Sequence, residues 1–265
     1  MIQILKYPRT QHIEGSRLQE GDQDLSQVPF KVIKNRQIVV EEKMDGANSG
    51  VSFSDDGELL LQSRGHYLNG GPRERHFALF KTWANTFTEP LFEILTDRYI
   101  MYGEWMFAKH TVFYTDLPHY FLEFDIYDKE EKIFLSTAER QKLLKNAPFV
   151  VPVKVLHDGK LSRLADLKKL ITPSFFIAEN ATEILQKICN SKKLRSEQVL
   201  METDLSGLME GLYIKVEENG RVVERYKWVR HDFLQTALSS GSHWHDRPII
   251  PNQLQGNLED LFIAL

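Results

Sequence analysis

The sequence predicts an α+β fold in which antiparallel β-structure encloses a mostly helical stretch. Short segments rich in β-branched and aromatic residues recur between residues 37 and 127 and between 208 and 229. Residues 136–203 show mostly helical patterns instead. Asp56-Gly57 and Asn219-Gly220 are turn dipeptides of the kind that join neighbouring antiparallel strands.

The elements of the first half follow in order. Gln37 to Lys43 is a β-branched run that predicts a strand, and period-two alternation places Glu41 and Lys43 on one face of it. Val51 to Phe53 and Leu59 to Gln62 flank a turn and predict a hairpin. The remaining segments of this half are predicted helices at Arg73–Phe87 and Leu91–Leu95 and predicted strands at Tyr99–Trp105 and Tyr120–Tyr127.

The second half begins with a helix signal, because Ser136 and Glu139 have the spacing of a capping box. The stretch that follows, about 136–203, is a mostly helical insertion in a domain that spans residues 1–230. A hairpin around Asn219-Gly220 closes this domain. Residues 231–265 are then a short C-terminal extension packed on it.

Composition places the chain among soluble globular proteins. It has 265 residues, of which 42% are hydrophobic and 26% charged, and no apolar run reaches the ~18 residues of a membrane span. The N-terminus lacks a signal-type apolar region, so we expect a cytoplasmic protein with no membrane partner. Cys189 is the one cysteine, which excludes an internal disulfide and a cysteine-based zinc cluster; a small core residue is its expected role.

The net charge of −4 argues against a passive coat for nucleic acid but not against an enzyme that handles nucleic acid locally. Positive charge gathers at residues 73–81, 187–195 and 221–230. Contact with phosphate is one interpretation of each segment. For the first two segments the alternative is a solvated helix face.

The hairpin turn at Asn219-Gly220 permits a prediction of strand register. If these residues form the turn, Lys227 lies opposite Leu212 and Arg225 lies opposite Ile214.

In that register one face carries Glu210, Arg225 and Lys227 beside apolar side chains. A carboxylate and two cations on such a face are costly unless something there uses them, and a phosphate with a divalent metal would. The other face pairs Lys215 with Glu224, which predicts an ordinary ion pair on the solvent side.

Lys43 begins the segment Lys43-Met-Asp-Gly-Ala-Asn48 at the end of its strand. Turn chemistry alone explains a Lys-x-Asp-Gly sequence. A lysine that a rigid strand delivers into a tight turn is also a candidate covalent nucleophile, once its pKa is lowered.

Taken together, the motifs resemble those of the covalent lysine nucleotidyltransferases, and specifically the ATP-dependent RNA ligases of the RNA-ligase-2 type. Any one motif is weak, but six occur in the family's order over about seventy percent of the chain. They are Lys43-Met-Asp-Gly-Ala-Asn48, Ser63-Arg64-Gly65, Tyr102-Gly-Glu104-Trp105, Leu122-Glu-Phe124-Asp-Ile126, Met209-Glu210-Gly-Leu-Tyr-Ile-Lys215 and Arg225-Tyr-Lys227-Trp228.

The resemblance implies a nucleotidyltransferase (adenylation) domain with two antiparallel sheets that border an ATP cleft. It implies that Lys43 attacks the α-phosphorus of ATP and holds AMP. The AMP then passes to an RNA 5′-phosphate, and a 3′-hydroxyl RNA end attacks the activated end. Magnesium or manganese is implied as well, because charge on phosphate oxygens must be stabilised in each step.

Roles for the catalytic residues follow from the same resemblance. Lys227 and a bound metal would lower the pKa of Lys43 and neutralise the α-phosphate. Glu210, with Glu104, would hold the metal. Arg225 stands where these enzymes often have a second lysine, so its contact with the nucleotide has a different donor geometry.

The nucleotide-binding roles are implied similarly. Phe124 would stack on adenine, with an ordinary core position as its rival. Glu41 or Glu42 would contact the adenine edge, and strand parity favours Glu41. The ribose would be held by Glu104 and Arg64, unless Arg64 reaches the RNA end, and Asn48 would contact the RNA-end phosphates or the leaving group.

The C-terminus departs from many relatives, because the 35 residues after the hairpin are too few for an OB domain. This argues against a DNA ligase or a capping enzyme, although ligation of nicked DNA stays open as an alternative. A non-catalytic, nucleotide-dependent RNA-binding partner is a second alternative, opposed by the presence of all the motif residues. The resemblance also raises an end-healing kinase or phosphatase as a partner. His243 and His245 in the tail predict a packed or phosphate-contacting loop rather than a zinc site.

Overall fold

The computed structural model of the chain describes residues 4–18, 26–233 and 248–263. Within these ranges twelve strands form one sheet. The strands are β1 (Gln11–Ile13), β2 (Gln27–Val28), β3 (Ile38–Lys43), β4 (Ala47–Phe53), β5 (Leu59–Ser63), β6 (Tyr99–Trp105), β7 (Phe121–Asp128), β8 (Ile133–Leu135), β9 (Val151–Pro152), β10 (Val155–Gly159), β11 (Gly211–Glu218) and β12 (Arg221–Val229).

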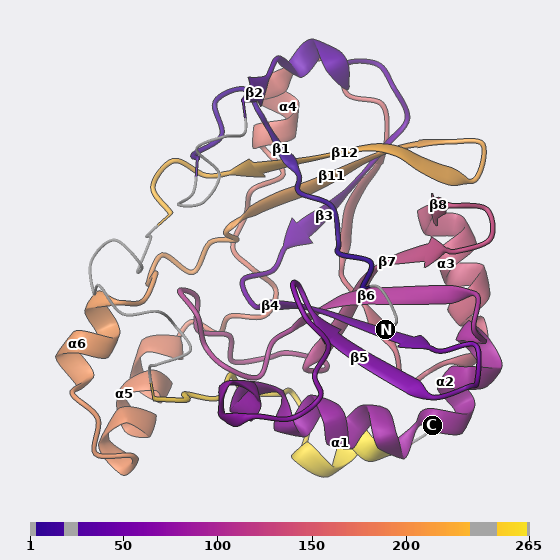
Figure 1. The fold of residues 1–265 in the computed structure, drawn as a ribbon. Helices are drawn as coiled ribbons and strands as arrows, with labels where there is room; N and C mark the ends of the chain where they lie inside the picture. The colour runs from indigo at the N-terminus through magenta and orange to yellow at the C-terminus, as the bar shows by residue number, and fades with distance from the viewer. Residues whose placement is uncertain (1–3, 19–25, 234–247, 264–265) are drawn as a thin grey trace.

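The sheet has two halves joined by a single short strand. Its order is β10-β3-β11-β12-β8-β7-β6-β4-β5, and β8 pairs with β12 on one side and with β7 on the other. In Figure 1 β3, β11 and β12 lie above β4 to β7. The prediction of two separate antiparallel sheets is therefore wrong in connectivity, because β8 links the two halves into one hydrogen-bonded network.

Most of the predicted strands of the first half are confirmed. The β-branched run predicted at 37–43 is β3, and the predicted segments 99–105 and 120–127 are β6 and β7. The predicted hairpin is β4 and β5, which pair antiparallel across the turn that contains Gly57. Gly57 has a φ of 78°, a left-handed conformation that glycine adopts without steric cost.

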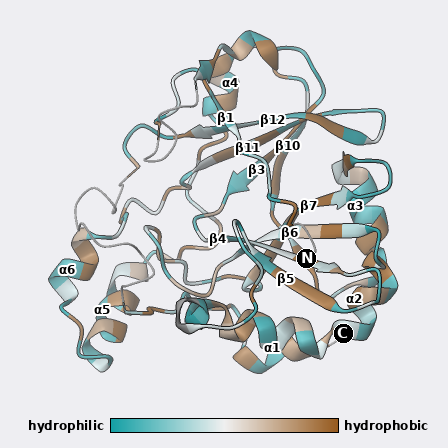
Figure 2. Ribbon diagram, viewed as in Figure 1, coloured by the Kyte–Doolittle hydropathy of each residue, from teal (hydrophilic) through white to brown (hydrophobic). Residues whose placement is uncertain are grey.

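Helices cover the outer surfaces of the sheet. They are α1 (Ala78–Thr86), α2 (Thr88–Leu95), α3 (Thr137–Leu143), α4 (Leu164–Lys168), α5 (Ala181–Ser191) and α6 (Ser196–Met201), with 3-10 turns η1 (Phe30–Val32), η2 (Pro72–Phe77), η3 (Leu144–Asn146) and η5 (Leu258–Phe262). On α1 the buried residues Phe80, Trp83 and Ala84 follow helical spacing and form one apolar face. Figure 2 shows this alternation of hydrophilic and hydrophobic residues along α1.

Residues 136–203 contain the four helices α3 to α6, but also the two strands β9 and β10. β10 pairs with β3 and β9 with β7, so part of this segment belongs to the sheet. One of the two hydrogen bonds of the predicted capping box forms at its start, because the Ser136 hydroxyl accepts from the Glu139 N–H. The Ser136 N–H donates to the Gly220 carbonyl instead of to the Glu139 side chain. Local patterns predicted α3 well because its cap is local, and missed β10 because its partner is distant in sequence.

Two large hydrophobic cores lie on the two halves. One packs β4 to β7 against α1 and α2, and an aromatic group of Phe80, Trp83, Trp105 and Phe121 lies within it. The other packs β3, β11 and β12 against α4 and η1. Each half thus has its own core, and these two cores hold in place the strand ends that face each other between the halves.

The described part of the C-terminal extension packs in two places. Leu261 is buried in the core of β4 to β7, where η5 lies against α1, and Ile250 is buried in a separate cluster with Phe113 and with Leu185 of α5. The predicted loop of His243 and His245 lies outside the described residues. No helix among the described residues is long and apolar enough to cross a membrane.

Candidate active site

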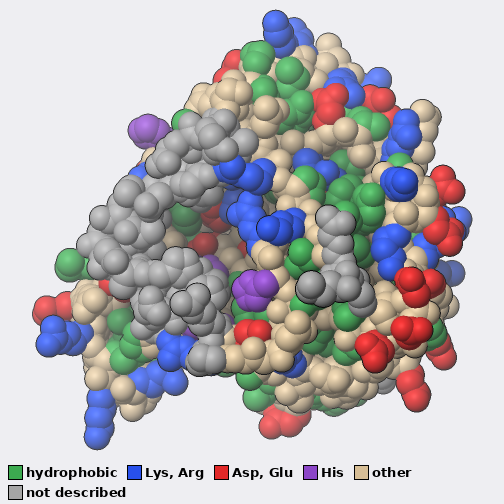
Figure 3. Space-filling model, viewed as in Figure 1, with side chains coloured by type: hydrophobic (Ala, Val, Ile, Leu, Met, Phe, Trp, Pro, Cys, Tyr) green, Lys and Arg blue, Asp and Glu red, His purple; other side chains and the backbone are tan. Residues whose placement is uncertain are grey.

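A cavity of about 550 Å³ lies between the two halves of the sheet. Residues of β3, β11 and β12 line one side of it, and residues of β4, β5, β6 and β7 line the other. Figure 3 shows the hollow bordered by Lys, Arg and His side chains, with acidic side chains deeper inside. Of the predicted site residues, those in its wall are Glu41, Glu42, Lys43, Asn48, Arg64, Glu104, Phe124 and Lys227.

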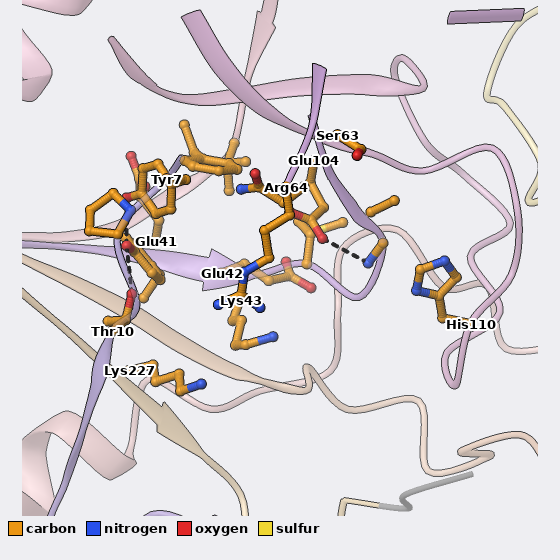
Figure 4. A pocket seen from close by; sticks show the side chains of 18 of the residues that line it. Tyr7, Thr10, Glu41, Glu42, Lys43, Ser63, Arg64, Glu104, His110 and Lys227 are labelled. Carbon is orange, nitrogen blue, oxygen red and sulfur yellow. Dashed lines mark hydrogen bonds between the residues drawn. The ribbon is translucent and has the colours of Figure 1, made fainter. Parts of the chain in front are cut away.

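Lys43 ends β3 and projects into this cavity (Figure 4). Its Nζ lies 2.7 Å from the Glu210 carboxylate, which is almost fully buried. Burial alone lowers the pKa of Lys43, but the charges of Glu210, Glu104 and Asp45 together outweigh burial and raise its pKa above the ordinary value. The lysine is therefore held protonated by the carboxylates around it.

Glu104 lies on β6, across the cavity from β3. Burial raises the pKa of the Glu104 carboxyl to about 8, with Glu210 and Asp45 adding to the rise, while Lys43 opposes it. The carboxylate also accepts a hydrogen bond from the Gly46 N–H at 3.2 Å. Glu104 thus keeps its proton to a higher pH than an ordinary glutamate, and Glu210 is the carboxylate paired with Lys43.

The register of the β11–β12 hairpin differs from the predicted one. Lys227 pairs with Tyr213 instead of Leu212, because the register shifts between Val216 and Glu217 and leaves Val223 as an extra residue on β12. The prediction is therefore wrong about which β11 side chains lie on the same face as Lys227. The apolar residues predicted there lie in a core instead, and Tyr213 is on the face of Lys227.

Lys215 is also on this polar face, contrary to the predicted solvent-side pair with Glu224. It is fully buried, and its Nζ lies 2.8 Å from Glu41 and 3.4 Å from Asp125. Glu224 instead pairs with Arg36. The one-residue shift is the physical reason, because it turns Lys215 from solvent into the interior.

Glu41 shares its face with Lys43, as strand parity predicts, but its carboxylate is engaged. Arg140 donates to it at 2.7 Å and Lys215 pairs with it, so Glu41 belongs to a buried ion network. Glu42 accepts from Ser174 at 2.6 Å. Burial raises the pKa of Glu42 to about 7, although the Ser174 hydrogen bond and the charge of Lys154 lower it.

Phe124 and Arg225 differ in their relation to the cavity. Phe124 lines it and packs edge-on against Tyr7, with ring centroids 5.1 Å apart. Arg225 is not among the lining residues. Its guanidinium lies 4.0 Å from the centroid of the Phe134 ring and 3.7 Å from Asp125, behind the wall of the cavity. The structure thus brings Lys227, but not Arg225, to the cavity.

Several lining residues were not predicted from the sequence. Tyr7, Pro8 and Thr10 reach the cavity from the N-terminal segment, and His66 and His110 from loops. Figure 4 shows Tyr7 and His110 at opposite ends, with Lys43 and Glu104 between them. No local signal marks the N-terminal residues, because their place depends on contacts with strands far along the chain.

The donor set suits a metal ion that arrives with a nucleotide. Among the described residues, no group of three or more His, Cys, Asp or Glu side chains is arranged to hold a metal. Glu210, Glu104 and Asp45 are the carboxylates that bear on Lys43, and the Asp45 carboxylate already accepts hydrogen bonds from the N–H groups of Thr111 and Val112. Glu104 and Glu210 are therefore the two that fit a metal. Magnesium commonly binds one or two carboxylates together with substrate phosphates, and these residues fit that pattern.

Comparisons with known proteins identify the family and the fold. The sequence profile of the RNA ligase family matches residues 36–229. A Naegleria gruberi RNA ligase variant with ATP and manganese has a similar fold, with a TM-score of 0.53 and 19% identity over 86% of this chain and 56% of that one. The same ligase with pyrophosphate gives 0.50 and 17% over 91% and 59%.

At these identities the structural likeness shows the fold alone, and the chain spans less than two thirds of those ligases. No curated protein sequence matches it. The family profile, however, covers well over half of the residues, and it includes every predicted site residue. The chain therefore belongs to the RNA ligase family.

Proposed function

We propose that the chain is an ATP-dependent ligase that joins 5′-phosphate and 3′-hydroxyl RNA ends through lysyl-AMP and RNA-adenylate intermediates, in cytoplasmic RNA repair. The observation that carries the proposal is Lys43 at the centre of a cavity large enough for a nucleotide. Its Nζ is 2.7 Å from Glu210, and the cations Arg64 and Lys227 line the same cavity.

Lys43 must be a neutral amine when it attacks the α-phosphorus of ATP, because the protonated form has no lone pair. The carboxylates that now raise its pKa favour the protonated form. Magnesium or manganese, held by Glu104 and Glu210 with phosphate oxygens, would supply the positive charge that favours the neutral amine and stabilises the phosphate oxygens. Glu210 is also the nearest acceptor for the proton that the amine gives up.

The first bond joins Lys43 Nζ to the α-phosphorus, while the bond from that phosphorus to the pyrophosphate oxygen breaks. Lys227 lines the cavity from β12 and would neutralise the α-phosphate as charge develops. The adenylyl group then passes to an RNA end: an oxygen of the RNA 5′-phosphate bonds to the α-phosphorus while the bond from that phosphorus to Lys43 Nζ breaks. A 3′-hydroxyl then attacks the 5′-phosphorus of the RNA, and AMP leaves.

The other wall residues divide between base, ribose and phosphate. Phe124 would stack on adenine, and Glu41 or Glu42 would contact its edge. Arg64 and Glu104 would bind the ribose. Asn48 would contact the leaving group or the RNA end. Arg225 lies behind the wall, so we propose that it supports the cavity through Asp125 instead of contacting the nucleotide.

The test is incubation with α-labelled ATP and magnesium or manganese, followed by denaturing electrophoresis. Label should remain on the wild type and on Lys34→Ala, a change at an exposed lysine, but not on Lys43→Ala. A wild type that takes no label with either metal would overturn the proposal, and would favour a non-catalytic RNA-binding protein.

The DNA alternative needs a second measurement. Nicked duplexes with RNA or with DNA on the 3′-hydroxyl side are offered to the labelled enzyme. Faster sealing of the RNA end supports the proposal, whereas equal or faster sealing of the DNA end favours a DNA nick ligase. Including an end-healing kinase or phosphatase would show whether such a partner is needed for damaged ends.

A further inference from the structure

The turn that follows Lys43 is fixed by a loop that lies far from it in sequence. The Asp45 carboxylate accepts hydrogen bonds from the N–H groups of Thr111 and Val112, each at 2.7 Å. The Asp45 N–H donates to the Tyr114 hydroxyl at 3.0 Å. Both the side chain and the backbone of Asp45, two residues after the nucleophile, are thus held by residues 111–114.

This loop, residues 106–120 between β6 and β7, has no helix or strand of its own. A long loop without a helix or strand needs outside support to keep one conformation. Residues 176–204 give part of this support, and the C-terminal segment gives a further part. Lys109 N–H donates to Ile250 at 2.8 Å, and Gln253 N–H donates to Tyr114 at 2.9 Å.

Asn252 is the centre of this support and is fully buried. Its side-chain oxygen accepts from the Tyr114 N–H at 3.0 Å, and its side-chain nitrogen donates to Met106 at 2.6 Å. Its backbone N–H donates to Phe107 at 2.9 Å, and its carbonyl accepts from the Tyr120 hydroxyl at 2.6 Å. One asparagine therefore joins both ends of the loop.

We infer that Asn252 and Tyr114 are positioning residues for adenylylation: the C-terminal segment holds the loop, and the loop holds Asp45 and thereby the turn that aims Lys43. The inference rests on the proposed function, and it gives a role to a segment outside the region that the family profile matches. Neither residue lines the cavity, so both act through Asp45.

The consequence for the reaction is specific. Attack on phosphorus requires the amine within about 3 to 3.5 Å and in line, and a displacement of about 1 Å costs as much as a hundredfold in rate. Adenine and ribose would bind elsewhere in the cavity, at Phe124 and Arg64. A loosened turn should therefore lower the rate constant of lysyl-AMP formation and leave the KM for ATP nearly unchanged.

Tyr114→Phe tests this directly, because it removes only the hydroxyl that accepts from Asp45. Ser54→Ala is the matched control: Ser54 is also buried, and its hydroxyl accepts from a backbone N–H at the same 3.0 Å, that of Glu58 in the turn between β4 and β5. Single-turnover labelling with α-labelled ATP, over a range of ATP concentrations, gives the rate constant and the KM. Thermal unfolding of both variants measures what each hydroxyl contributes to stability.

We expect Tyr114→Phe to lower the rate constant at least about tenfold at unchanged KM, and Ser54→Ala to stay within about twofold of the wild type. Asn252→Ala should act in the same direction. Combined with Tyr114→Phe it should cost less than the sum of the two, because both act on one turn.

Two results overturn the inference. A labelled wild type with equal rate constants for Tyr114→Phe and Ser54→Ala shows that the buried hydroxyl is structural only, and leaves the proposed function intact. A wild type that takes no label overturns the proposed function and the inference with it.

Discussion

The carboxyl groups around Lys43 are held in three different ways. Glu210 is paired with the lysine, Glu104 is buried beside it with its pKa raised to about 8, and Glu42 is bonded to Ser174 with its pKa raised to about 7. Buried carboxylates that lack a full set of partners oppose folding, and they are found where function requires them. The buried carboxyl groups of the cavity therefore lower the stability of the fold, as expected of residues that a functional site requires.

Glu42 provides a measurable pH dependence. Its folded pKa of about 7 exceeds its ordinary value of 4.5, so the folded chain keeps a proton that the unfolded chain has lost between these values. Stability from this group is complete below pH 4.5 and declines as the pH rises through 7. Glu42→Gln cannot ionise. The free energy of unfolding of Glu42→Gln, minus that of the wild type, should therefore rise by about 3 kcal/mol between pH 4.5 and pH 8.

Urea unfolding of both proteins across this range checks the prediction. Ser174→Ala removes a hydrogen bond that favours the charged form of Glu42, so the decline should extend to higher pH in that variant. A constant difference between wild type and Glu42→Gln at all pH values would contradict the prediction.

The candidate catalytic residues were predictable where each of them stands in a short local motif. Lys43, Glu104 and Lys227 each stand in a short sequence pattern, and all three line the cavity. Tyr7 and Asn252 carry no such pattern. Their places depend on hydrogen bonds to residues more than a hundred positions away, which no local pattern records.

At the scale of elements, strand existence was easier to predict than strand register. A β-branched run marked β3, segments of aromatic and apolar residues marked β6 and β7, and Asn219-Gly220 marked the hairpin turn. The shift after the turn was missed, because Val222 and Val223 are alike and nothing in the sequence says which of them is the extra residue. The side-chain period of two then reversed the predicted face of β11.

Deletion of Val223 tests whether it is the extra residue. If it is, its removal leaves Glu224 opposite Val216 and Lys227 opposite Tyr213, so the lysine keeps its place in the cavity wall and lysyl-AMP formation stays close to that of the wild type. In an unshifted register the same deletion would turn Lys227 to the other face, and labelling would fall by about a hundredfold or more, the usual cost of losing one transition-state donor. Val223→Ala keeps the register in either case and is the control.

Labelling with α-labelled ATP measures both variants, and circular dichroism shows whether the deletion variant still folds. A folded deletion variant whose labelling falls by about a hundredfold would contradict the assigned register.

At the scale of the whole molecule, the two halves of the sheet are joined across the base of the cavity by buried charges. Lys215 of β11 pairs with Asp125 of β7, which belongs to the other half, and it donates to the Phe124 carbonyl. Arg140 of α3 bonds to Glu41 of β3 and to Glu123 of β7. β8 supplies the backbone connection, and this network supplies the side-chain connection.

The network predicts that Lys215 matters for stability far more than a surface lysine would. Lys215→Ala leaves Glu41 and Asp125 short of a cation in the interior, and should lower the free energy of unfolding by about 3 to 5 kcal/mol. Glu224→Ala removes an exposed pair with Arg36 and should cost at most about 1 kcal/mol. Lys215→Met separates charge from volume, since it fills the space without the ammonium group. Urea unfolding at pH 7 measures all three, and equal costs for Lys215→Ala and Glu224→Ala would show that the halves are not held together by these charges.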